Sequence, residues 1–327
     1  MSTSGVYTWQ LQRNAIVSQA FKKLGLLPKG QELAPEDLNE GITQLNSMVK
    51  SWQSEDIYLW KFEIINLFLQ YGQNKYVVGP GSGTDHATLD YDYSYLASAA
   101  SAGATSITVQ DATGFTIGKT IGVVQSSYVV FWTTIANVVG NVITLTAPLD
   151  EVAAADRNVF CYSDKPAKPL KMKYATLLNL AQNESGQQGY ETQMNVLARK
   201  DYELLSVKYQ AAGYPSEIMF EPRRTEGWIW ISQAPANTTQ VMKLNVVYPF
   251  QAFEAADNDP DFPEEWTNTL VYNLAAELIA DYGVEGTRAE VVLKRAEELK
   301  QKLLDYDMED TYLQIDVAVF PRRQWGR

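Results

Sequence analysis

The sequence has few of the residues on which catalytic and metal sites most often depend. Its 327 residues include one cysteine, Cys161, and one histidine, His86. A single cysteine excludes an internal disulfide framework and argues against redox chemistry. It fits an intracellular assembly environment, and secretion without disulfides is the alternative. A single histidine excludes His-based catalytic triads and multi-histidine metal sites within one chain. We expect His86 to occupy a solvated loop.

Basic residues and long apolar runs are also scarce. Lys and Arg number 27 against 39 Asp and Glu, so the formal net charge is −12. This excess of acidic residues argues against a broad basic surface that would bind the phosphates of a nucleic acid. The N-terminal residues MSTSGVYTWQLQRN lack the apolar core of a signal peptide, and no apolar run approaches the length of a membrane span. We therefore expect no membrane association.

Apolar residues are plentiful and their spacing predicts an α+β fold. With 46% hydrophobic residues the chain can bury a large core, in two domains or in one with an insertion. Helical spacing predicts helices over 15–24 and 35–52, and aromatic and β-branched residues over 57–78 predict a β-hairpin around Gly72. These elements make up a first segment, residues 1–96, of a helical bundle body with an antiparallel β-sheet.

The composition changes abruptly near residue 97. Residues 97–163 are rich in Ser, Thr, Ala, Gly and Val in short strand-like runs, which is typical of a small inserted all-β domain. Residues 164–311 return to the body. There we predict a helix over 199–212, then strands in SEIMFEP, GWIWIS and VMKLNVVYPF that extend the hairpin's sheet, and finally two long helices. We expect residues 312–327 to form an extended C-terminal tail.

Two glycine-containing loops invite comparison with phosphate-binding motifs. GFTIGKT at 114–120 has three residues between its glycines where the P-loop requires four, and it lies among predicted strands. GPGSGTD at 79–85 is more simply a flexible loop. We therefore predict no nucleotide or other cofactor.

Acidic residues provide two further candidates. Asp257, Asp259 and Asp261 alternate as at the start of a calcium loop, but Phe262 replaces the required glycine, so an acidic surface loop is favoured over a metal site. Glu277 and Asp281 lie one helical turn apart and could perform acid and base chemistry. The alternative for this pair, which we favour, is a polar contact at the edge of an interface.

The segment DFPEEWTNTLVYNLAAELIADYG, residues 261–283, predicts a helix with almost no charged side. Its apolar residues cover well over half of the circumference, and much of the remainder carries small or uncharged residues. Such a helix can lie between its own core and a second surface, either inside one domain or against another copy of the chain. The candidate subunit-interface residues are Thr269, Tyr272, Asn273, Ala276, Glu277 and Ala280.

The C-terminal tail has the composition of an interface. Its apolar residues alternate as in a strand that pairs with a sheet edge, and arginine and tryptophan, which often anchor interfaces, follow. The candidate partner-interface residues are Ile315, Val317, Val319, Phe320, Arg322, Arg323, Trp325 and Arg327. A frayed terminus is the alternative.

Four segments in this order resemble a known family, the head-to-tail adaptors of short-tailed phages, also called packaged DNA stabilisation proteins or tail tubular protein A. They are AFKKLGLLPKGQELAPEDLNEGITQLNSMVKSWQSEDIYLW, FLQYGQNKYVVG, DYELLSVKYQAAGYP with its following strands, and DFPEEWTNTLVYNLAAELIADYG. None is a catalytic signature, and the 97–163 insertion departs from the smallest adaptors.

The resemblance implies a structural virion protein rather than an enzyme. It implies a homo-dodecameric ring that attaches below the portal protein at the head–tail junction, retains packaged DNA and provides a platform for a tail nozzle or tail tube protein. Assembly would take place in the host cytoplasm, and residues 312–327 would reach into grooves of the portal. DNA would pass through the lumen without specific binding, which the acidic balance favours.

Two alternatives come from other functional classes. The first is a cell-wall (peptidoglycan) hydrolase, in which Glu277 or Asp281 would act. The second is a carbohydrate-binding virion protein, in which the β insertion would hold the glycan.

Overall fold

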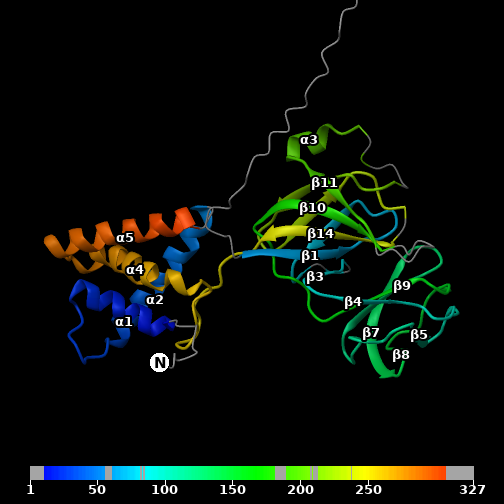
Figure 1. The fold of residues 1–327 in the computed structure, drawn as a ribbon, viewed down its shortest axis with the longest axis horizontal. Coiled ribbons are helices and arrows are strands. Elements are labelled where there is room, and N and C mark those ends of the chain that lie inside the picture. The colour runs from blue at the N-terminus through cyan, green and yellow to red at the C-terminus, as the bar shows by residue number, and fades with distance from the viewer. Residues whose placement is uncertain are drawn as a thin grey trace, which may run out of the picture. The chain divides into compact units, whose positions relative to one another are not determined.

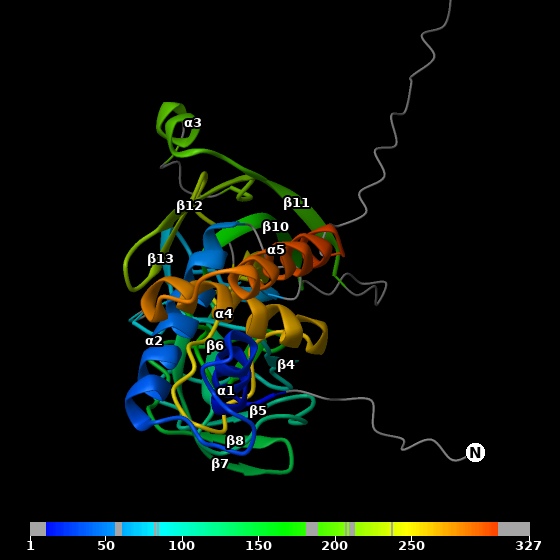
Figure 2. The same cartoon turned by 90° about the vertical axis from the view of Figure 1, so that its left-hand side faces the viewer.

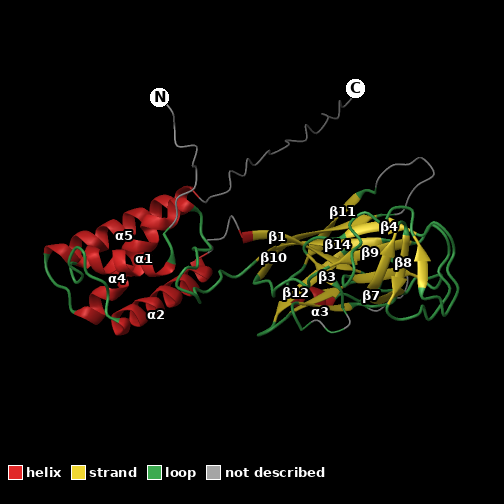
Figure 3. Ribbon diagram, turned by 90° about the horizontal axis from the view of Figure 1, so that it is seen from below, coloured by secondary structure: helices red, strands yellow, loops and turns green. Residues whose placement is uncertain are grey.

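Helices and strands occupy largely separate parts of the chain (Figure 3). The structure is a computed structural model that describes residues 11–55, 61–81, 83, 85–180, 189–206, 208, 213–236 and 238–306. Two compact units are present, one formed by residues 1–60 with 250–327 and the other by residues 61–249. We call them the helical unit and the sheet unit and describe each by itself. The fold is therefore α+β.

The helical unit is built from both ends of the chain. Its helices, visible in Figures 1 and 2, are α1 (Arg13–Leu24), α2 (Pro35–Trp52), α4 (Thr267–Tyr282) and α5 (Thr287–Tyr306), with short 3-10 turns at Gln53–Glu55 and Glu264–Trp266. All four helices contribute to one apolar core. The helices predicted over 15–24, over 35–52 and in the two C-terminal segments are thus confirmed.

Local sequence signals set the ends of these helices. Pro35 occupies the first turn of α2, where its missing N–H costs no hydrogen bond. Gly25 follows α1 with φ 78°, and Gly283 follows α4 with φ 59°. Both glycines adopt the left-handed conformation that ends a helix and that other residues rarely tolerate.

The sheet unit contains two sheets and one short helix. The larger, barrel-like sheet of eight strands has the order β2-β13-β12-β11-β10-β14-β1-β3, and the smaller sheet of six strands has the order β4-β9-β6-β7-β8-β5. The strands of the larger sheet are β1 (Phe62–Phe68), β2 (Lys75–Val78), β3 (Ala87–Thr88), β10 (Lys171–Asn179), β11 (Glu191–Val196), β12 (Glu217–Pro222), β13 (Gly227–Ile231) and β14 (Gln240–Val247). Those of the smaller sheet are β4 (Asp92–Tyr95), β5 (Ser106–Thr108), β6 (Thr120–Val124), β7 (Val130–Val139), β8 (Val142–Leu145) and β9 (Asn158–Tyr162).

The predicted 57–78 hairpin is wrong in its pairing. β1 and β2 form near its expected place, but β1 pairs with β14 and β3, whereas β2 pairs with β13. The turn between them is fixed by a distant segment, because the Gly72 N–H donates to the Pro235 carbonyl. Residue spacing located both strands and the turn, but the partners are decided by burial of apolar faces across the whole sheet.

The larger sheet is mixed rather than antiparallel. β11 and β12 run parallel, with Asn195 opposite Glu217, and all its other paired strands are antiparallel. A parallel pair needs a crossover connection, and helix α3 (Arg199–Leu204) lies in it. The helix predicted over 199–212 is shorter than expected, because Leu205 already has extended backbone angles.

The β-rich insertion begins earlier than residue 97, because β4 already belongs to the smaller sheet. The strands expected in this region are confirmed as an antiparallel sheet. Residues 61–96 and 164–249, assigned from sequence to the adaptor body, group with the insertion in one compact unit. An aromatic and aliphatic cluster joins the two sheets and consists of Phe68, Val124, Val130, Phe160, Tyr162, Leu180 and Val241.

Candidate interaction site on the helical unit

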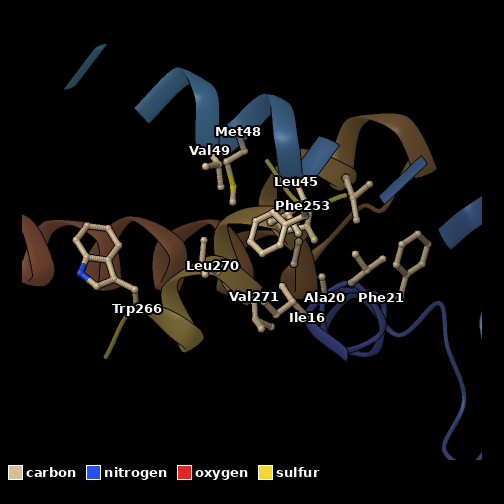
Figure 4. Packing of buried hydrophobic residues seen from close by; sticks show 14 of the residues in the cluster. Ile16, Ala20, Phe21, Leu45, Met48, Val49, Phe253, Trp266, Leu270 and Val271 are labelled. Carbon is tan, nitrogen blue, oxygen red and sulfur yellow. The ribbon is translucent and has the colours of Figure 1, made fainter. Parts of the chain in front are cut away.

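Helix α4 lies at the centre of the helical unit and buries its larger apolar face against α1 and α2. Leu270, Leu274 and Leu278 are fully buried in the shared core, and Figure 4 shows Leu270 and Val271 among side chains from α1 and α2. Before α4, the ring of Trp266 lies 5.8 Å from that of Trp52 on α2. This face is the hydrophobic core of the unit.

Part of the second face of α4 is covered by the chain's own α5. The Asn273 side-chain amide donates to the carbonyl oxygens of Thr269, at 2.9 Å, and Ala296, at 3.3 Å, so it bridges the two helices. Thr269 is only 1% exposed. Ala276 is partly buried against the same core. These three candidate interface residues therefore have intramolecular neighbours, which accounts for the lack of charge on this face.

Tyr272 lies in a hollow of different character. The Lys23 ammonium on α1 lies 4.8 Å from the centre of the Tyr272 ring, a cation–π geometry. The same hollow, about 280 Å³ in volume, is lined by Arg288, Val291 and Val292 from α5, and Val291 is 60% exposed. We call it the Tyr272 hollow. Its charged residues are cationic.

Glu277 and Ala280 are exposed on α4. Asp281, also exposed, accepts a hydrogen bond of 3.1 Å from the Gln44 side chain on α2. The carboxylates expected one turn apart thus lie at the surface of the unit, and one of them already bonds an amide. This arrangement resembles the polar edge of a surface more than a pair of buried catalytic acids.

At the C-terminal end of α4, Tyr282 forms one wall of a second hollow. The hollow has a volume of about 320 Å³, its apolar walls include Leu26, Leu27 and Leu33, and the acidic residues Glu32 and Asp37 line it. We call it the Tyr282 hollow. Leu26 is 40% exposed.

The hydroxyl of Tyr282 lies in an acidic environment. It donates a hydrogen bond of 2.8 Å to the Asp37 carboxylate. Desolvation, this hydrogen bond and the negative charges of Asp37, Glu40 and Asp281 raise the pKa of Tyr282 to about 12. The hydroxyl therefore remains a donor at neutral pH, and the surrounding carboxylates provide negative potential.

Both glycine-containing loops are held by contacts within the chain. In GFTIGKT, the Lys119 ammonium contacts the Asp92 carboxylate at 2.9 Å and donates to the Gly114 carbonyl at 2.7 Å. The cation that a phosphate would need is thus paired with a carboxylate of the chain. In GPGSGTD, the Asp85 carboxylate accepts 2.7 Å hydrogen bonds from the Val77 N–H and the Gln73 side chain, which ties the loop to β2.

The expectation of a solvated His86 is wrong. Its ring is half-buried and stacks on Trp132. The Nδ1 atom of the ring lies 2.7 Å from the Tyr162 hydroxyl oxygen. Burial and the positive charge of Lys165 lower the pKa of His86 to about 4. The sequence around His86 carries no sign of this environment, because Trp132 and Tyr162 come from distant strands.

The remaining candidate residues are Cys161 and the aspartates of the 257–261 loop. Burial raises the pKa of the Cys161 thiol to about 11, so it is not a thiolate at neutral pH. Asp261 accepts a 2.9 Å hydrogen bond from the Gln251 N–H, and this bond helps to fold the loop that also carries Asp257 and Asp259. Across the described ranges no group of three or more His, Cys, Asp or Glu residues could hold a metal ion.

The candidate partner-interface residues of the tail lie outside the described residues. They are Ile315, Val317, Val319, Phe320, Arg322, Arg323, Trp325 and Arg327. Among the helices that the structure describes, none has the length and apolar character needed to cross a membrane.

Comparisons with known proteins do not assign the chain to a family. No protein-family model matches the sequence, and no significant relative was found among curated proteins.

Proposed function

We propose that this chain is a structural virion protein, a head-to-tail adaptor that forms a ring below the portal, retains packaged DNA and offers the tail a platform. The observation that carries the proposal is the packing of the chain's two ends into one helical unit. Segments 20–60 and 261–283, which carry most of the family resemblance, contribute α1, α2 and α4 to a shared core although more than half of the chain separates them.

The position of the tail in the chain supports the same role. Residues 312–327 follow shortly after α5, so they are tethered to the helical unit rather than to the sheet unit. A tail rich in arginine and aromatic residues on a compact helical body is suited to anchoring a ring to a preformed partner.

Electrostatics support a conduit rather than a DNA clamp. The net charge of −12 disfavours tight binding to the phosphate backbone, and DNA that must slide through a lumen benefits from a wall that repels it. The exposed Glu277 and Asp281 add to this negative surface.

Reconstitution with portal rings of the same phage tests the proposal. Electron microscopy of the mixture should show a second ring on the portal, and a chain ending at Thr311 should dock more weakly. A full-length chain whose residues 312–327 are shuffled provides the matched control for length and charge. Portal rings that gain no density at any chain concentration would contradict the adaptor function.

A hydrolysis assay separates the enzymatic alternative. If the chain is an adaptor, purified protein should release no peptidoglycan fragments above a buffer control. Turnover that is present in the wild type and lost in Glu277→Gln would instead favour a cell-wall hydrolase.

A further inference from the structure

The Tyr282 hollow has the form of a binding site for an aromatic and cationic group. Its walls combine apolar side chains with acidic ones, Leu26 remains 40% exposed, and its volume of about 320 Å³ can accept one large side chain. Glu32 and Asp37 line it, and Asp281 and Glu40 lie close enough to act on the Tyr282 hydroxyl. Lys29 is the one basic residue in the connection from Gly25 to Ala34 that borders the hollow.

The chain itself contains a segment with the complementary chemistry. Residues 320–327 read FPRRQWGR and combine two aromatic side chains with three arginines and no acidic side chain. Arginine forms strong, often bidentate hydrogen bonds with carboxylates, and tryptophan fills apolar hollows at interfaces. The segment therefore matches the hollow in both charge and apolar character.

The covalent connection is long enough for the segment to reach the hollow of its own chain. Helix α5 begins beside the hollow, because Arg288 in its first turn bonds the Leu24 carbonyl, and α5 ends at Tyr306. A 20-residue helix is about 30 Å long. Residues 307–319 can span about 40 Å when extended, so they can return over the length of α5.

We propose that residues 320–327 bind in the Tyr282 hollow of the same chain, with an aromatic side chain between the leucines and arginines on the surrounding carboxylates. The tether gives the segment a high effective concentration at the hollow, which favours its own chain over a second copy. The Tyr272 hollow is not the site, because no carboxylate lines it and its charged lining residues, Lys23 and Arg288, are both cationic. This inference does not depend on the adaptor function, although a tail that docks elsewhere would first have to leave the hollow.

A competition experiment tests the proposal. A fluorescent peptide of residues 312–327 is titrated with the full-length chain and with a chain ending at Thr311, and binding is followed by anisotropy. The peptide should bind the shortened chain, and it should bind the full-length chain about tenfold more weakly, a difference of ~1.4 kcal/mol. High salt should weaken the binding to the shortened chain.

Two variants of the shortened chain locate the site. Leu26→Arg places a positive charge in the Tyr282 hollow and should weaken peptide binding about tenfold, ~1.4 kcal/mol. Val291→Arg makes the same change at an exposed residue of the Tyr272 hollow and should leave the affinity unchanged. Circular dichroism melts of both variants check that each one folds.

Three results would overturn the proposal. The first is a failure of the peptide to bind the shortened chain, and the second is equal binding to the Leu26→Arg and Val291→Arg variants. The third is peptide binding to the full-length chain that weakens further as the concentration of that chain is raised. Such a dependence would assign the hollow to the tail of another copy. Each result is obtained without portal rings, so it is independent of the test of the adaptor function.

Discussion

The indole of Trp132 stacks face to face on the imidazole of His86, with 3.9 Å between ring centroids and 8° between ring planes. Trp132 comes from the smaller sheet and His86 immediately precedes β3 of the larger sheet. The His86 Nδ1 atom lies 2.7 Å from the hydroxyl of Tyr162 on β9. The single histidine of the chain is thus part of the contact between the two sheets.

Acidification should destabilise this contact. The folded pKa of His86 is about 4, below the ordinary value of 6.5. Between these values the unfolded chain binds a proton that the folded chain does not, so stability falls as the pH drops from about 6.5 towards 4. The contribution of His86 is on the order of 2 kcal/mol after allowance for partial solvent exposure. Urea unfolding of the sheet unit at several pH values measures it.

The variant His86→Asn supplies the control for this pH dependence. Asparagine places a hydrogen-bonding atom near the position of Nδ1 but does not titrate. The variant should be less stable at pH 7, because it loses the stack on Trp132, yet its stability should change less between pH 6.5 and 4. Equal slopes in the two proteins would show that carboxylates, not His86, govern the acid response.

A side chain at Gly122 should destabilise the protein, because the Trp132 ring lies over this position. The two residues are directly opposite in the β6–β7 pair, and a Cβ atom on Gly122 would lie 2.5 Å from the ring. Gly122→Ala must therefore displace Trp132 from His86, at a cost of about 1–3 kcal/mol. Thermal unfolding should show the loss. In a Trp132→Leu background the same substitution should cost much less, and an additive double mutant would contradict the explanation.

The sequence predicted individual elements better than it predicted their partners. The helices ending at Gly25 and Gly283 carry their apolar spacing and end signals locally, so they could be located. β1 and β2 could also be located, but their separation in the sheet depends on β13 and β14, more than a hundred residues away.

Elements without a strong local pattern escaped sequence reasoning. β10 and β11 were not predicted. In β11, ETQMNV, only Met194 is buried, so the strand shows little apolar alternation. The candidate site was predictable in its residue types but not in its neighbours. The uncharged face of α4 indicated a second contact, and only the fold shows that α5 supplies it at Asn273.

Gly25 should be needed both for its backbone angle and for the space it leaves. Its φ is 78°, and a Cβ atom would lie 1.5 Å from Nη1 of Arg288, which donates to the Leu24 carbonyl. Gly25→Ala should destabilise the helical unit by about 1–3 kcal/mol, seen as a lower Tm in calorimetry. Gly30→Ala is the matched control, because Gly30 has φ 84° and nothing within 4 Å of its Cβ position. It should cost less, and equal losses would indicate that backbone strain alone matters.

Thr269→Val should stabilise the chain. Thr269 is 1% exposed, and within the described part of the chain its hydroxyl has no hydrogen-bond partner. Valine keeps the shape and removes the unsatisfied polar atom, which is worth about 1 kcal/mol. Asn273→Ala is the opposite case, because it deletes a side chain that bonds both Thr269 and Ala296, and it should cost about 1–2 kcal/mol. Chemical denaturation of the dilute protein measures both changes, and a Thr269→Val protein that is less stable than the wild type would indicate that the hydroxyl has a partner such as a buried water or a neighbouring copy.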